Sequence, residues 1–121
     1  MKYTVLVDNR TNNPALETEH GLSVLLETER HRILLDTGAS DLLVRNAQKM
    51  GIDLGTVDYV FISHGHKDHA GGLKHFMAIN DKAKVIVSRC HEWEILLQTR
   101  PSAQHYFGLA QYSRGTFNQG R

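Results

Sequence analysis

Three histidines and a carboxylate lie within the six residues from 64 to 69, directly after the apolar run at residues 59–62. The four side chains are His64, His66, Asp68 and His69. Neutral imidazoles and ionised carboxylates are the ligands that Zn²⁺ prefers, and side chains two positions apart on an extended segment project to the same side. We therefore predict that His64 and His66 bind one metal ion.

Asp68 and His69 are adjacent at a predicted turn, so we expect them to point elsewhere and to serve a second ion close to the first. Three glycines, Gly65, Gly71 and Gly72, keep that turn sterically open. A solvated histidine-rich loop is the alternative interpretation. The run follows a strand pattern and precedes a helix pattern, however, and this context favours a metal site.

Two segments of the chain resemble the metallo-β-lactamase superfamily. The block SHGHKDHAGGL at residues 63–73 is similar to the HxHxDH signature of that family, and ILLDTG at residues 33–38 is similar to its Asp-bearing strand end. The opening YTVLVDN and the segment HGLSVLLET at residues 20–28 also resemble the branch of metal-dependent hydrolases that includes the dihydropterin synthase of methanopterin biosynthesis. The resemblance extends over residues 1–88.

This resemblance implies hydrolysis of a small-molecule substrate by metal-activated water. It assigns His64 and His66 to the first ion and Asp68 and His69 to the second, with Asp68 also orienting the nucleophile as the catalytic residue. Asp36 would act behind the ligands by fixing an imidazole or the loop, and a simple turn role is its alternative. We expect one or two zinc ions, with iron or manganese as alternatives because His and carboxylate ligands suit all three metals.

The elements that must position these residues alternate between strand and helix patterns. Strands are predicted at 3–7, 23–27, 32–36, 58–63 and 84–88, and helices at 41–50, with Ser40 as N-cap and Gly51 as the end, and at 73–77. This order indicates an α/β fold, in which ligands gather at the carboxyl ends of strands. The resemblance implies one half of an αββα sandwich, a mixed sheet with helices on one face.

Strand-forming residues become scarce late in the chain. Residues 1–88 contain thirteen Val and Ile residues, whereas residues 89–121 contain only Ile95. We therefore predict a half-domain over residues 1–100 and an irregular or disordered tail over residues 101–121.

The predicted metal site is short of ligands. A catalytic zinc normally takes three protein ligands and a water, yet the motif supplies two per ion. In the family, a second half of the fold adds the rest, but here no acidic residue follows Glu94, and the late histidines are His91 and His105. The explanations are a truncated or shifted reading frame with a degenerate tail, which we favour, a natural half-domain that pairs with another copy or chain, or a compact protein that recruits His91 as third ligand. His20, His31, His75 and His105 rank below His91, because none lies beside a candidate ligand in the sequence.

Composition excludes several classes of partner. Fourteen basic and thirteen acidic residues give a net charge of +1 without like-charge runs, which argues against nucleic acid. With no leader, no run of eighteen apolar residues and only Cys90, we expect no membrane association, no intramolecular disulfide and a cytoplasmic location. Cys90 itself reads as a small buried hydrophobe rather than a metal ligand. The alternative function is a non-catalytic metal-binding or interaction module, in which a homodimer or partner chain covers the open sheet.

Overall fold

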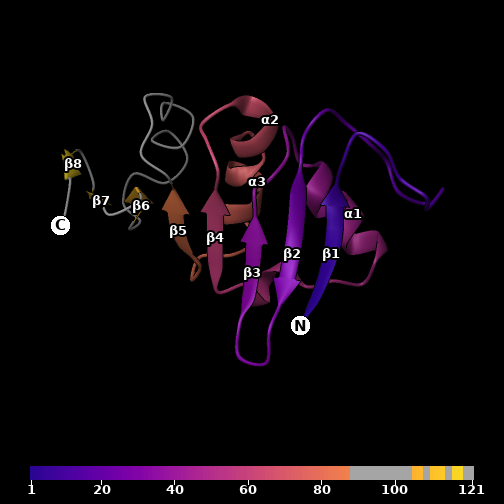
Figure 1. Cartoon of the computed structure of the whole chain (residues 1–121), viewed down its shortest axis with the longest axis horizontal. Coiled ribbons are helices and arrows are strands. Elements are labelled where there is room, and N and C mark those ends of the chain that lie inside the picture. Colours follow the sequence, from indigo (N-terminus) through magenta and orange to yellow (C-terminus); the bar gives the residue numbers. More distant parts are fainter. Residues whose placement is uncertain (88–104, 108–109, 114–115, 119–121) are drawn as a thin grey trace.

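The computed structural model describes residues 1–87, 105–107, 110–113 and 116–118. Eight strands among these residues form one sheet whose spatial order follows the chain from β1 to β8 (Figure 1). Their bounds are β1 Lys2–Val7, β2 Ser23–Glu27, β3 Arg32–Leu35, β4 Tyr59–Ile62, β5 Lys84–Val87, β6 His105–Phe107, β7 Ala110–Ser113 and β8 Thr116–Asn118. The first five strands confirm the five that the sequence predicts, to within one or two residues at each end.

The sheet is mixed, as expected from the sequence. Strands β1, β2 and β3 pair antiparallel, β3 to β6 pair parallel, and β6 to β8 pair antiparallel again. The parallel pairing of β3 with β4 sets Leu35 opposite Phe61. As a result, the residues that follow these two strands, Asp36 and the metal-ligand run, meet at the same edge of the sheet.

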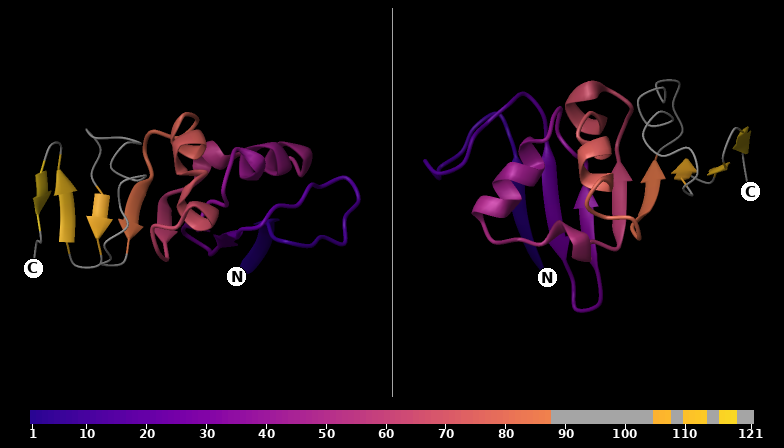
Figure 2. Two further views of the ribbon diagram at one scale, coloured as in Figure 1. Left: turned by 90° about the horizontal axis from the view of Figure 1, so that it is seen from above. Right: turned by 180° about the vertical axis from the view of Figure 1, so that it is seen from behind.

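Helices α1 (Leu42–Lys49) and α3 (Leu73–Met77) lie on one face of the sheet (Figure 2). Both confirm predicted helices. The Ser40 hydroxyl accepts a hydrogen bond from the Leu42 N–H at 3.2 Å, although the N-cap position itself belongs to Asp41, one residue later than predicted. The helix ends where expected, since Gly51 takes a left-handed φ of 70° that favours glycine.

Two short elements were not predicted: the 3-10 turn η1 (Leu54–Thr56) and helix α2 (Lys67–Ala70). Each is a single turn, too short to produce a helical repeat of apolar residues. Helix α2 nevertheless matters for the site, because it contains Asp68 and His69.

The hydrophobic core lies between the sheet and the helices. One row across the sheet is fully buried there and consists of Leu25, Leu34, Val60 and Val85. It packs in one cluster with residues of the helices, among them Leu43, Ala47, Leu73 and Phe76. Alternate residues of the same strands point to the opposite face, as a period of two requires.

Strands β6 to β8 lie within residues 101–121, where the sequence predicts irregular structure, and the division at residue 100 stays a prediction. His91 and Cys90 lie outside the described residues. None of the described helices is long and apolar enough to cross a membrane.

Candidate metal centre

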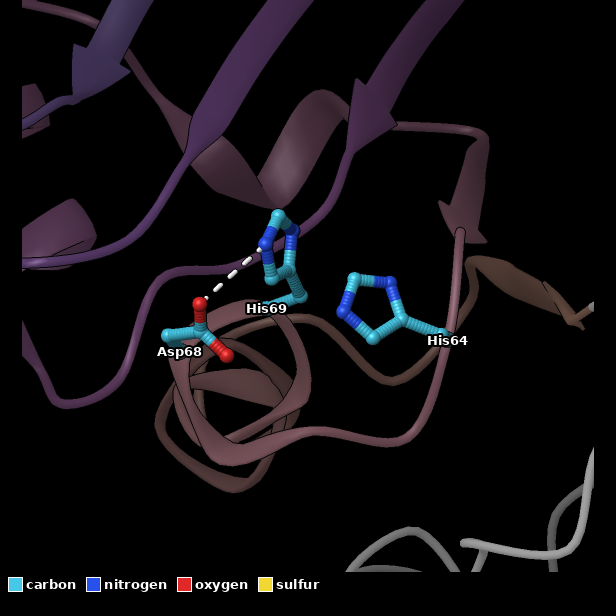
Figure 3. A group of neighbouring side chains, drawn as sticks. All are labelled: His64, Asp68 and His69. Carbon is cyan, nitrogen blue, oxygen red and sulfur yellow. Dashed lines mark ion pairs between the residues drawn. The ribbon is translucent and has the colours of Figure 1, made fainter.

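The candidate ligands lie on the loop after β4 and on the helical turn that follows it. One ligand atom each of His64, Asp68 and His69 lies within 4.8 Å of those of the other two (Figure 3). A tetrahedral zinc with ligand bonds of about 2.1 Å has donors separated by about 3.4 Å, so small side-chain rotations bring these three to bonding distance. Two imidazoles and a carboxylate also form a donor set that suits a divalent ion.

The grouping within the run differs from the two pairs expected from the sequence. His66 is the N-cap of α2, and the backbone N–H groups of His69 and Ala70 donate to its carbonyl oxygen at 3.0 and 2.9 Å. This helical turn brings Asp68 and His69 back toward His64, so that the ring centroids of His64 and His69 are 4.2 Å apart. The expectation that Asp68 and His69 point away from the first pair is therefore wrong.

His66 lies beside this group rather than within it. Its ring makes an edge contact with the ring of His64, with centroids 4.7 Å apart. Its role as a ligand stays a prediction, as do the metal-binding roles of the other three residues.

Asp36 anchors the histidine on α2. Its carboxylate is buried, and Oδ2 lies 2.7 Å from Nδ1 of His69. Because a carboxylate ion only accepts hydrogen bonds, Nδ1 donates to it, and the tautomer of the neutral ring that fits this contact has its lone pair on Nε2, where a metal could bind. The structure thus confirms the contact that the sequence suggests for Asp36.

Asp36 also holds His64, through a serine that the sequence analysis did not identify. The Ser63 backbone N–H donates to Asp36 Oδ1 at 2.7 Å, and the Ser63 hydroxyl donates to Oδ2 at 2.8 Å. The same hydroxyl oxygen lies 2.8 Å from Nδ1 of His64 and, because its own hydrogen is donated to Asp36, accepts a hydrogen bond from that ring nitrogen. Both imidazoles therefore expose Nε2 and take their orientation from one carboxylate.

The backbone of Asp36 is itself unusual. Its φ of 57° lies in the left-handed region, which Asp tolerates better than most residues. Its N–H donates to the carbonyl of Phe61 at 2.8 Å, and its own carbonyl accepts from the hydroxyl of Ser23 at 2.8 Å. Strained conformations of this kind persist where the surrounding structure fixes them, often at functional sites.

His20 lies next to a candidate ligand, contrary to the low rank that we gave it. Its Nε2 is 3.3 Å from Asp68 Oδ2, the same distance that separates His69 Nε2 from that oxygen. Sequence reasoning missed it because His20 precedes β2, and only the folded chain brings the two residues together.

A cavity of about 390 Å³ opens beside these residues. On one side it is lined by Asp68 and His69, and on the other by the segments before β2; the remaining lining residues are Asp8, Asn9, Arg10, His20, Gly21 and Leu22. Two of the candidate ligands, Asp68 and His69, therefore border this open space.

Comparison with known proteins identifies the family to which the chain belongs. A match to the metallo-β-lactamase superfamily spans residues 16–112. Among curated proteins, the chain is 38% identical over 71 residues to an uncharacterized protein of Methanocaldococcus jannaschii, covering 59% of this chain and 27% of that protein. It is 31% identical over 104 residues to the 7,8-dihydropterin-6-methyl-4-(β-D-ribofuranosyl)-aminobenzene-5'-phosphate synthase of the same organism, covering 82% of this chain and 35% of the synthase.

Solved structures give the same result. The chain is 48% identical to Tm1679, a metal-dependent hydrolase of the β-lactamase superfamily, with a TM-score of 0.52 over 60% of this chain and 26% of that one. A metallo-β-lactamase HARLDQ motif mutant of Cronobacter sakazakii is 30% identical, with a TM-score of 0.51 over 67% of this chain and 32% of that one. The chain therefore spans about a third or less of the length of these relatives.

Proposed function

Because the chain belongs to the metallo-β-lactamase superfamily, we propose that it is a metal-dependent hydrolase that acts on a small molecule with metal-activated water. The observation that carries this proposal is the convergence of His64, Asp68 and His69 beside an open cavity. A bound divalent ion would lower the pKa of a water molecule to about 7 and so supply hydroxide at neutral pH. We propose zinc, as one or two ions, with iron or manganese as alternatives.

The chain's own residues would prepare the site for this chemistry. Asp36 holds the Nδ1 atoms of His64 and His69, directly or through Ser63, so that both Nε2 atoms remain available. Asp68 lines the cavity, and we propose that its carboxylate accepts a hydrogen bond from the attacking water and orients it. His66 is proposed as an additional ligand, since its ring already contacts that of His64.

The relatives support the reaction class more than the substrate. One of them is a metal-dependent hydrolase and another is a synthase of a phosphorylated dihydropterin. The chain spans only 26% and 35% of these two relatives, so most of each relative lies outside the matched part. A shared fold does not by itself identify a substrate. We propose hydrolysis in a cytoplasmic setting, which the single cysteine supports, and we leave the substrate class at small molecules.

Metal content and hydrolysis test the proposal separately. Metal-free protein is incubated with zinc, iron or manganese, passed through a desalting column and measured for bound metal. We expect about one ion or more per chain for native protein and for His75→Ala, whose histidine lies on α3 outside the candidate group, and a loss of most metal in His64→Ala. Native protein that retains no metal would overturn the proposal.

Activity is then measured with ester, thioester and phosphodiester reporter substrates. Hydrolysis that depends on added metal and on His64 supports the enzyme. If the protein binds stoichiometric metal but hydrolyses none of the reporters, the result favours a chain that is inactive on its own. The functional groups that it lacks would then have to come from another chain or another part of a longer protein.

A second candidate function rests on the face of the sheet opposite the helices. Two rows of paired residues cross this face: Tyr3, Leu26, Ile33, Tyr59 and Lys84, and Val5, Val24, Leu35, Phe61 and Ile86. Nine of these ten residues are apolar or aromatic, and Tyr3, Val5 and Phe61 remain 70%, 40% and 40% exposed. Apolar faces of this extent rarely stay in contact with water.

We propose that a second copy of this chain covers the face. The two rows contain one charged residue, Lys84, so charge complementarity would contribute little to the selection of a different protein as partner. In a two-fold symmetric dimer, by contrast, each copy presents the same apolar patch to the other. Sedimentation of the metal-free and metal-loaded chain tests this directly. A dimer at micromolar concentration is expected, and a monomer at every accessible concentration would overturn it.

A further inference from the structure

We propose that His20 is a positioning residue for Asp68, held in place by Asn9. It would fix the carboxylate beside the histidine ligands before a metal binds. The inference rests on the proposed metal site, and it assigns a role to a segment before β2 that the ligand motif does not contain.

The hydrogen-bond chain fixes which atoms donate. Asn9 Oδ1 accepts from the backbone N–H of Gly21 at 3.2 Å, so the other end of the amide, Nδ2, faces His20 Nδ1, also at 3.2 Å. An amide nitrogen only donates, and Nδ1 of His20 must therefore accept. In the neutral imidazole the proton is then on Nε2, which lies 3.3 Å from Asp68 Oδ2 and faces the carboxylate.

Backbone contacts hold the same two segments together. The Leu22 N–H donates to the carbonyl of Asp68 at 3.3 Å, and the Leu22 carbonyl accepts from the N–H of Gly38 at 2.9 Å. Gly21 packs so closely that a Cβ at this position would lie 2.5 Å from the Asp68 carbonyl oxygen. The segment from His20 to Leu22 thus contacts both the backbone and the carboxylate of Asp68.

The position of the contact suggests its purpose. Asp68 Oδ2 lies 3.3 Å from His20 Nε2 on one side and 3.3 Å from His69 Nε2 on the other. The two rings differ in what holds them: Nδ1 of His69 is paired with the buried Asp36, whereas Nδ1 of His20 is paired with Asn9 on the segment before β2. His20 therefore orients the Asp68 carboxylate from the side opposite the proposed ligand His69.

The exposure of His20 makes the proposal testable. Its side chain is 80% exposed, so its removal leaves no cavity in the core and should not unfold the chain. Mutation of a residue that orients a metal ligand through a hydrogen bond typically lowers metal affinity by about 10- to 100-fold. Substitution of an exposed residue without this role would change neither the metal affinity nor the ligand geometry at the metal.

The experiment titrates metal-free protein with Co²⁺ and follows the visible absorption bands, which report both the dissociation constant and the ligand geometry. Native protein is compared with His20→Ala, His20→Gln and His31→Ala. Gln can place an N–H donor near the position of Nε2, and His31 is an exposed histidine that lies beside Asp58, away from the site. Thermal unfolding of each metal-free variant controls for folding.

For His20→Ala we expect a dissociation constant raised about 10-fold or more and altered bands, with the unfolding temperature unchanged. His20→Gln should recover most of the affinity, and His31→Ala should match native protein. If His20→Ala has native affinity and bands while His64→Ala does not bind, the role of His20 is overturned and the metal site stands. If native protein does not bind Co²⁺, both proposals fail.

Discussion

The carboxylate of Asp36 lies 2.7 Å from Nδ1 of His69, although 33 positions separate the two residues in the chain. The contact forms because Asp36 follows β3 and His69 lies on the turn after β4, and these strands are parallel neighbours. It leaves Nε2 of His69 facing Asp68. The geometry of the proposed metal site therefore depends on a residue that is not itself a proposed ligand.

Replacement of Asp36 by Asn should weaken metal binding more than it weakens the fold. Asn can still accept the Ser63 N–H through Oδ1, but its amide nitrogen cannot accept from His69 or from the Ser63 hydroxyl. We expect about a 10- to 100-fold loss of metal affinity and a loss of about 1–3 kcal/mol of stability from the mismatched buried group. Co²⁺ titration and urea unfolding measure the two effects. Unchanged affinity would show that the Asp36 contact does not orient the ligand.

Ser63→Ala should affect His64 selectively. The substitution removes the hydroxyl that links His64 Nδ1 to Asp36, while the backbone N–H of residue 63 can still donate to the carboxylate. We expect about a 10-fold loss of metal affinity, and Ser63→Thr, which keeps a hydroxyl, should retain most of it. The imidazole proton resonances of His64, observed by NMR, should change in the Ala variant and remain in the Thr variant. Equal metal affinities for the two variants would show that the hydroxyl link between His64 and Asp36 does not support metal binding.

The sequence was sufficient to predict the five N-terminal strands and two of the helices, but not the shortest elements or all of the contacts. Local sequence patterns, either a regular spacing of apolar residues or a capping residue, predict the five N-terminal strands, α1 and α3. The run of candidate ligands also lies at the end of a strand, as predicted. The contact between Ser63 and Asp36 requires knowledge that β3 and β4 are neighbours. The contact between His20 and Asp68 requires the path of the whole segment between β1 and β2, which no local pattern specifies. The single turn of α2 is too short for a periodic signal, and this is why the grouping of His64 with Asp68 and His69 was not foreseen.

Gly21→Ala should destabilise the chain more than Gly51→Ala does. Both glycines have positive φ values, 155° and 70°, but a Cβ at residue 21 would lie 2.5 Å from the Asp68 carbonyl oxygen, whereas nothing lies within 4 Å of a Cβ at residue 51. We expect a cost of about 1–2 kcal/mol for Gly51→Ala from its backbone conformation alone and a larger one, about 3 kcal/mol or more, for Gly21→Ala. Chemical unfolding of the metal-free forms gives both values. Equal costs would mean that the close packing against Asp68 is easily relieved.

Asp58 should make the fold sensitive to acid. The backbone N–H of Arg32, which donates to Asp58 at 3.0 Å, holds the pKa of this carboxyl below its ordinary value of 3.8, with help from Lys82 and His31. Because the folded-state pKa is lowered, the stabilisation is present above the unfolded pKa and is lost as the pH falls through the folded value. The free energy of unfolding of native protein should exceed that of Asp58→Asn by about 1 kcal/mol at neutral pH. This difference should shrink as the pH falls below about 4. A difference that stays constant from neutral to acidic pH would contradict this origin.

Phe61→Lys should break the proposed dimer. Phe61 is 40% exposed and lies in the row between Leu35 and Ile86 on the face opposite the helices, so a lysine there would bring a charge into the contact between two copies. We expect the dimer dissociation constant to rise about 100-fold or more, because a buried charge without a partner is costly. Ile79→Lys is the matched control, since Ile79 is similarly exposed at 49% but follows α3 and lies outside the two rows. Sedimentation equilibrium should therefore show a monomer for the variant at residue 61 and a dimer for the variant at residue 79, and the same mass for both would exclude this face as the contact.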